Sequence, residues 1–148
     1  MDEQILDAPS SVGTKLNYAG FWIRFAAYFI DAVILSIVQF ALAFLFVGDS
    51  TSIFAPNLTV QLFSVVLGIA YFAGMESSSR QATLGKMGVG IKVGNAQGQQ
   101  ISFVNALGRY LGKILSALIL LIGFMMAGWD SKKQALHDKL AGTYVFYK

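Results

Sequence analysis

The sequence predicts an all-α fold, a transmembrane helical bundle of three membrane helices with a cytoplasmic loop that could form a short β-hairpin. Apolar residues make up 55% of the 148-residue chain and charged residues only 13%, whereas soluble domains carry about 25% charged residues. Three stretches are also long and apolar enough to cross a hydrocarbon core about 30 Å thick, which requires about 20 helical residues. These stretches are residues 21–47, 58–75 and 106–129.

A polar N-terminal tail, residues 1–18, precedes the expected membrane domain, residues 19–148. The tail begins with the acidic residues Asp2 and Glu3, whereas a secretory signal begins with a basic region. We therefore expect the first apolar helix to stay in the mature protein.

Composition and motifs exclude several classes of function. The basic residues that give a net charge of +3 are dispersed along the chain, which argues against a nucleic-acid partner. The absence of Cys and the single His exclude disulfides, thiol catalysis and Cys- or His-rich metal sites. Met87 stands where a phosphate-binding loop needs Ser or Thr after Gly85-Lys86, and no Ser-His-Asp arrangement exists. We therefore expect no enzyme, no metal and no cofactor.

The charges of the connecting segments predict the topology. Residues 48–57 carry one acid and no base, whereas residues 76–105 carry Arg80, Lys86 and Lys92. Because cytoplasmic loops are enriched in Lys and Arg, we expect the longer segment and the N-terminus in the cytoplasm and the shorter segment outside.

The basic C-terminal tail does not fit three full crossings, which would place it outside. Either the third apolar segment is re-entrant and returns, or the tail breaks the rule. Two strand-like segments, residues 89–93 and 143–147, favour a return because they could pair only on the same side. The third apolar run is too short for two full crossings, so the side of the tail stays open.

Asp31 lies near the middle of the first apolar stretch, where an acid costs about 2.5–3.5 kcal/mol on insertion scales. Arg24 is two turns earlier on nearly the same face, but helical side chains lean toward the N-terminus, so we expect it to point away from Asp31. Asp31 therefore needs a partner from elsewhere or a proton. It is either a proton or cation site or a buried structural residue, and Arg24 is either an interfacial anchor or a lipid-phosphate contact.

Polar and small residues share one face of the second helix, at Gln61, Ser64, Gly68 and Tyr71. Their spacing of three and four residues places them together. We interpret this face as a packing surface, with a narrow polar path as the alternative. Gln61 and Ser64 are candidates to support Asp31.

The third segment carries a small-residue ladder, Gly108, Gly112 and Ser116, which is typical of close helix–helix packing within one chain or between chains. Arg109 and Lys113 lie on the neighbouring face. We interpret them as snorkelling to lipid phosphates, and the alternative is that they are counter-charges for Asp31 or Asp138.

Arg24, Asp31 and Asp138, the last in His-Asp-Lys-Leu-Ala-Gly-Thr, together resemble the RDD family of prokaryotic multi-pass membrane proteins, which is named for one Arg and two Asp in this arrangement. The segment 81–93 is similar to that family as well, and the likeness extends over residues 18–147. The resemblance implies a location in the cytoplasmic membrane. It also implies that these three residues form a cation or proton site or a structural charge network, since transport, including sodium/proton exchange, has been suggested for the family.

Two functions follow from these features. The first is a small ion or solute transporter in which Asp31 exchanges a proton or monovalent cation, and which would form a homo-oligomer because three helices enclose little volume. The second is a non-catalytic accessory or assembly subunit whose charges are structural and whose partner is another membrane protein. The lipid bilayer is the surrounding medium in both cases.

Overall fold

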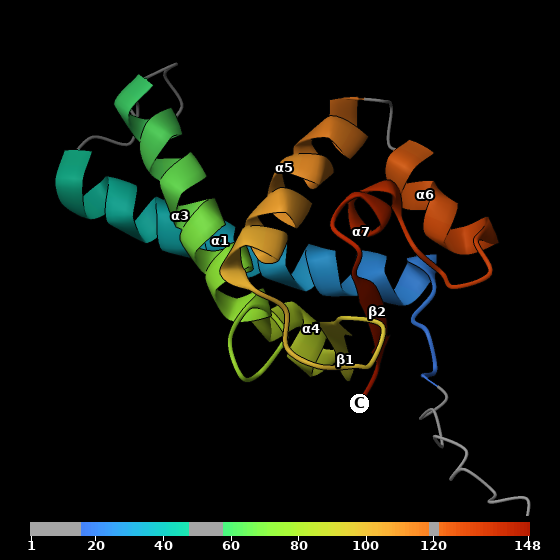
Figure 1. The fold of residues 1–148 in the computed structure, drawn as a ribbon. Helices are drawn as coiled ribbons and strands as arrows, with labels where there is room; N and C mark the ends of the chain where they lie inside the picture. The colour runs from blue at the N-terminus through green and yellow to red at the C-terminus, as the bar shows by residue number, and fades with distance from the viewer. Residues whose placement is uncertain (1–15, 48–57, 119–121) are drawn as a thin grey trace, which may run out of the picture.

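The computed structural model describes residues 16–47, 58–118 and 122–148, and the N-terminal tail and the short connection at 48–57 fall almost entirely outside them. It confirms a mostly helical fold with a small two-stranded sheet (Figure 1). The elements in chain order are α1 (Phe21–Val47), α3 (Leu58–Glu76), α4 (Leu84–Gly88), β1 (Ile91–Gly94), α5 (Phe103–Leu118), α6 (Ile122–Trp129), α7 (Leu136–Leu140) and β2 (Tyr144–Tyr147).

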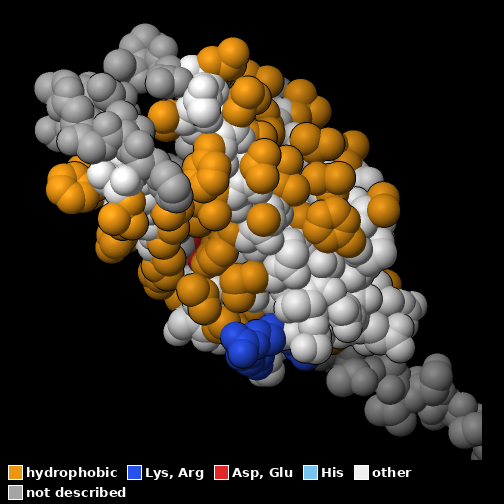
Figure 2. Space-filling model, turned by 90° about the vertical axis from the view of Figure 1, so that its left-hand side faces the viewer, with side chains coloured by type: hydrophobic (Ala, Val, Ile, Leu, Met, Phe, Trp, Pro, Cys, Tyr) orange, Lys and Arg blue, Asp and Glu red, His pale blue; other side chains and the backbone are white. Residues whose placement is uncertain are grey.

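Two helices, α1 and α3, are each long and apolar enough to span a membrane. Large apolar side chains point outward along both, for example Phe29, Ile37 and Val66. Figure 2 shows such side chains covering most of one face, with Lys and Arg gathered at one end. This distribution suits a protein whose apolar body lies in lipid and whose polar end lies in water.

The third apolar stretch is two helices rather than one, because α5 and α6 meet at a bend of 103°. The sheet pairs β1 with β2 in antiparallel register, from Ile91 opposite Tyr147 to Gly94 opposite Tyr144. The C-terminal tail therefore lies beside the segment that follows α3 (Figure 1). Of the two alternatives for the tail, this arrangement agrees with a chain that returns.

The short helix α4 docks directly on α1. Thr83 begins it with an extended backbone, and its side-chain oxygen accepts a hydrogen bond from the Lys86 backbone N–H. Gly85 makes the close approach, since a Cβ added there would lie 2.1 Å from the Ala27 carbonyl oxygen of α1. Only a residue without a side chain fits between these backbones.

Small and β-branched residues form the apolar core where α1, α3, α5 and the sheet meet, including Ala19, Ala27, Ala73, Ile91 and Val145. Most of the largest fully buried side chains are nevertheless polar or charged, among them Arg109, Glu76, Asp31 and Asp138. The interior is therefore held largely by hydrogen bonds and ion pairs, and these define the candidate site.

Candidate functional site

Asp31 is buried and accepts hydrogen bonds from three donors. They are the Tyr71 hydroxyl of α3 at 2.7 Å, the Thr83 hydroxyl at 2.6 Å and the Gly85 backbone N–H at 2.7 Å. A carboxylate has about four acceptor positions, so this one is nearly saturated. Its partners come from two other elements, and their arrangement joins α1 to α3 and to the start of α4.

Asp138, in the first turn of α7, receives two arginines. Arg24 from α1 and Arg109 from α5 each donate to one of its carboxylate oxygens, and the Ala135 backbone N–H donates at 3.1 Å. Burial would raise the pKa of Asp138, but the two guanidinium groups hold that pKa well below its usual range. The ionised Asp138 therefore caps its helix and also ties the tail to α1 and α5.

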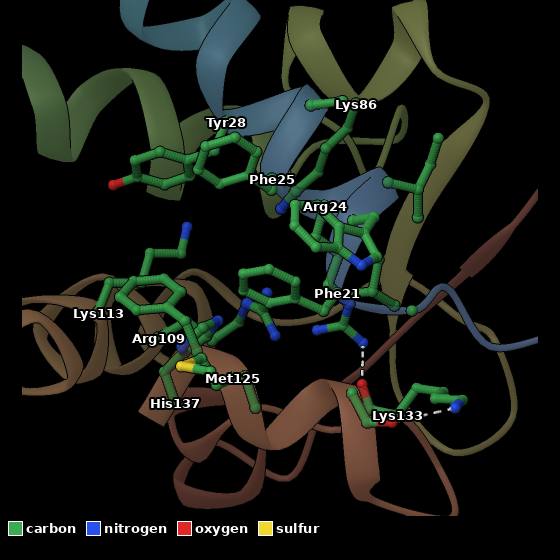
Figure 3. A pocket seen from close by; sticks show the side chains of 18 of the residues that line it. Phe21, Arg24, Phe25, Tyr28, Lys86, Arg109, Lys113, Met125, Lys133 and His137 are labelled. Carbon is green, nitrogen blue, oxygen red and sulfur yellow. Dashed lines mark hydrogen bonds between the residues drawn. The ribbon is translucent and has the colours of Figure 1, made fainter. Parts of the chain in front are cut away.

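Arg24 does not act as a lipid-facing anchor. Besides Asp138, it donates to the Ala19 carbonyl at 2.9 Å and to the Lys133 carbonyl (Figure 3). All these acceptors belong to the protein, so Arg24 is a structural link between the first helix and the C-terminal tail.

A third acid, Glu76, completes the network at the end of α3. It is fully buried and accepts from Lys86 at 2.5 Å, Arg109 Nε at 2.9 Å and Lys113 at 3.0 Å. The expectation that Arg109 and Lys113 snorkel to lipid is wrong, because they are only 1% and 6% exposed. Both act as counter-charges instead: Arg109 and Lys113 each pair with Glu76, and Arg109 also pairs with Asp138.

Sequence reasoning missed Glu76 because it follows directly on an apolar run, where an interfacial acid is ordinary. The available signal was the pair Arg109 and Lys113, four residues apart on one helical face. Such a pair inside an apolar segment needs an acid from another helix.

The network contains more cations than acids. Among the described residues, Arg24, Lys86, Arg109 and Lys113 converge on Glu76 and Asp138, and the cations remain in excess even if Asp31 is added. Burial lowers the pKa of Lys86 to about 8, although Glu76 favours its charged form. The protein therefore holds surplus positive charge in a place that water reaches poorly.

A cavity of 1420 Å³ opens beside this network between α1, α5 and α6 (Figure 3). All four cations line it, together with the aromatic and apolar side chains of Phe21, Trp22, Phe25, Tyr28, Ile114, Phe124, Met125 and Trp129. The cavity thus has a basic inner wall and an apolar outer wall.

His137 also lines the cavity, and its Nδ1 atom is buried without a hydrogen-bond partner within the described part of the chain. Its Nε2 atom lies 3.5 Å from the Asp138 carboxylate. Burial lowers the pKa of His137 to about 3, so the ring is neutral at physiological pH. Buried polar atoms normally find a partner, and this one has none among the described residues.

The predicted face of the second helix divides in the structure. Tyr71 reaches Asp31, and Gly68 packs against Tyr110, whose hydroxyl would lie 2.5 Å from an added Cβ. Gln61 is exposed, and Ser64 donates to the Val60 carbonyl of its own helix at 2.9 Å. Neither Gln61 nor Ser64 is therefore brought to Asp31.

The small-residue ladder of α5 packs within the chain at two of its three positions. A Cβ added to Gly112 would lie 2.9 Å from the Cβ of His137, and Ser116 packs against Gly123 of α6. Gly108 is exposed and has open space beside it, so it does not pack within the described part of the chain, and packing between chains stays a prediction for this position. The ladder holds α6 and α7 against α5.

The fold and the network define a class, a small helical membrane protein built around buried arginine–carboxylate pairs. The chain belongs to the RDD family, whose model matches residues 18–142. It is similar to YxaI of Bacillus subtilis (strain 168), with 37% identity over 88% of this chain and 97% of YxaI.

Membrane protein YteJ of the same organism is 32% identical, over 88% of this chain and 82% of YteJ. A proline-rich antigen of Mycobacterium leprae (strain TN) is 34% identical over 55% of this chain and 34% of the antigen. No solved structure matches this chain. Together with the two apolar helices, these relatives identify it as an integral membrane protein.

Proposed function

We propose that the protein is a small, non-catalytic transporter of the cytoplasmic membrane that takes an anionic solute into the cavity between α1, α5 and α6. The observation that supports this proposal is the excess of cations over acids on the inner wall of that cavity. Charge buried away from water is costly unless it is paired. A bound anion would supply the missing counter-charge.

The first test is binding of inorganic phosphate to the purified, delipidated protein in detergent. We expect sodium phosphate to raise Tm above its value in sodium chloride of equal ionic strength. Lys113→Gln should abolish the shift because Lys113 lines the cavity. Arg80→Gln removes the same charge at an exposed position outside the cavity and should leave the shift intact. A wild-type Tm that is the same in phosphate and in chloride would contradict the proposal.

Cation/proton exchange is a second candidate, and one observation favours it. Lys86, with a pKa of about 8, lies 2.5 Å from Glu76, so the pair could release a proton near physiological pH. Asp31 is less suited to this role, because three donors already occupy its carboxylate. We therefore place the candidate exchange site at Glu76 and Lys86.

Sodium-driven proton flux in liposomes tests this second candidate. Flux that survives Asp31→Asn but disappears in Glu76→Gln at matched insertion would support exchange at Glu76 and Lys86. Absence of flux from the inserted wild-type protein would exclude exchange. Flux unaffected by Asp31→Asn, together with less protein in the membrane, would favour a structural role for Asp31.

The alternative role as an accessory subunit draws support from how many charges are used in bonds within the chain. In that case the exposed basic tail, rather than the cavity, would contact another membrane protein. Loss of a co-purifying membrane partner on removal of tail lysines, with no phosphate effect on Tm, would favour this role over transport.

We also propose that the N-terminus and the C-terminal tail face the cytoplasm. The pairing of β1 with β2 supports this placement, since it holds the tail beside the basic segment after α3.

A further inference from the structure

We propose that the anion is the phosphate-bearing head group of a membrane lipid, whose acyl chains leave the cavity between α1 and α6. This inference rests on the proposed anion site and names its ligand. Three features of the cavity point to a lipid rather than to a water-soluble anion: its outer wall, its size and the donors left free on its inner wall.

The outer wall consists of side chains that belong in lipid. Trp22 and Trp129 line the cavity and are 77% and 74% exposed, and Phe25, Ile114 and Met125 are exposed as well. Trp22 and Phe25 lie on α1, which is long and apolar enough to cross a membrane, and exposed apolar side chains of such a helix face hydrocarbon. Tryptophan in particular favours the level of the lipid head groups. The cavity therefore opens sideways to the bilayer, and a ligand that extends through this opening must be apolar there.

The volume of the cavity also exceeds what a small inorganic ion needs. It measures 1420 Å³, whereas sites for drug-sized ligands typically measure about 300–1000 Å³. A phosphate ion alone would occupy only a small part of this space and would make no contact with the apolar wall. A head group with the first part of its acyl chains fills both the basic and the apolar part.

The inner wall retains hydrogen-bond donors for a phosphate group. Lys86 and Lys113 each donate to Glu76, and an ammonium group has three N–H bonds. Lys113 also lies over the Phe72 ring, with its Nζ 4.6 Å from the ring centre, so its position is fixed. Arg109 is already occupied by Glu76, Asp138 and Thr143, and Arg24 by Ala19, Asp138 and Lys133. Lys86 and Lys113 therefore keep free N–H bonds beside Glu76. Lys133, whose Nζ donates to the Gly128 carbonyl at 3.4 Å, is a third lysine on the wall.

His137 is a further feature of the inner wall. Its ring is 4% exposed and lines the cavity, and its Nδ1 atom has no partner in the described residues. A neutral imidazole nitrogen can donate to a phosphate oxygen or accept from a glycerol hydroxyl. A head group beside Lys113 would satisfy this buried atom if the ring turned it toward the cavity, since packing within the described residues leaves it unpaired.

The two tryptophans of the chain both line the cavity, so the difference in quenching between two lipids reports which of them lies against this wall. The protein is reconstituted in phosphatidylcholine vesicles that contain a minor fraction of lipid with brominated acyl chains, which quench tryptophan on contact. Brominated phosphatidylglycerol, which is anionic, is compared with brominated phosphatidylcholine at the same fraction. We expect phosphatidylglycerol to quench the wild-type protein more steeply.

Variants assign the selectivity to the cavity. Lys113→Gln should lower the preference for phosphatidylglycerol about fivefold, the equivalent of about 1 kcal/mol for one basic residue near an anionic head group. Lys113→Arg should restore it, and Arg80→Gln should match the wild type. Ala117→Phe, which fills the cavity without touching a charge, should also lower quenching and keeps the test informative if Lys113→Gln fails to fold.

Equal quenching by both lipids in the wild type would overturn the lipid assignment. If phosphate still raised Tm through Lys113 in that case, the proposed anion site would stand with a soluble ligand. If phosphate and phosphatidylglycerol were both without effect, the proposed function would fail together with this inference.

Discussion

Glu76→Gln removes the carboxylate on which three cations converge, and we expect it to destabilise the protein by about 3–5 kcal/mol, the usual effect of removing one partner from a buried ion pair. The three cations are not affected equally. Arg109 keeps Asp138 and Thr143 as acceptors, whereas Lys86 and Lys113 lose the acceptor seen in the structure. Two unpaired ammonium groups are therefore the source of the destabilisation.

The destabilisation should depend on pH in a defined direction. The folded-state pKa of Lys86, about 8, is below the ordinary value for lysine, and loss of the Glu76 charge lowers it further. A base whose pKa is depressed in the folded state makes folding least favourable below the folded pKa, and this penalty is relieved gradually as pH rises from the folded pKa toward the ordinary, unfolded pKa. We expect the difference in stability between wild type and variant to shrink from pH 7 to about pH 9.

Unfolding of the detergent-solubilised protein, followed by circular dichroism against heat and denaturant, measures these effects. Asp130→Asn is the matched control, because Asp130 pairs with Lys139 at 2.6 Å near the surface, and exposed pairs contribute little. The double variant Glu76→Gln/Lys113→Gln should recover part of the loss, since it also removes one unpaired cation. If Glu76→Gln lowered the free energy of unfolding no more than Asp130→Asn does, the reasoning would be refuted. Such a result would mean that water or a proton already stabilises the charges of this cluster.

Three further predictions concern other parts of the fold. Gly85→Ala should destabilise the protein by about 1–3 kcal/mol or more through the clash with the Ala27 backbone, whereas Gly108→Ala, with open space beside it, should be neutral or stabilising in the same thermal melts. His137 has a folded-state pKa of about 3, so the stability present above its unfolded pKa of about 6.5 is lost as pH falls toward 3. The Tm of His137→Gln should therefore fall less between pH 7 and pH 4 than the Tm of the wild type. An equal fall in Tm for the two proteins would contradict this. The chain has no Cys, so Lys148→Cys adds a single thiol; an impermeant maleimide should label it only in opened cells if the tail is cytoplasmic, and labelling of intact cells would place it outside.

The sequence was sufficient to predict what depends on local pattern. The helices α1 and α3 follow from long apolar runs, and Asp31 is conspicuous because it interrupts one of them. Helical periodicity also places Arg109 and Lys113 on one face, but it does not say which way that face points. Their direction depends on Glu76, which is more than 30 residues away in the chain, and no local pattern carries that information.

The hydrogen-bond partners of Asp31 could not be predicted from the sequence, for a similar reason. Tyr71 was recognised as part of a polar face, but Thr83 and Gly85 belong to a five-residue helix that is too short to show a periodic signal. The bend between α5 and α6 was one of two alternatives from the sequence. It is fixed by contacts of Gly112 and Ser116 with elements that come later in the chain.

The pairing of Arg24 with Asp138 has a consequence for biosynthesis. The two residues are separated by 114 positions, so the first helix must enter the bilayer long before its counter-ion has been translated. During that interval Arg24 and Asp31 are both without the acceptors and donors they have in the finished protein. The newly made helix is then at its least stable in lipid, and we expect it to become stable only when α7 emerges and the last strand pairs with β1.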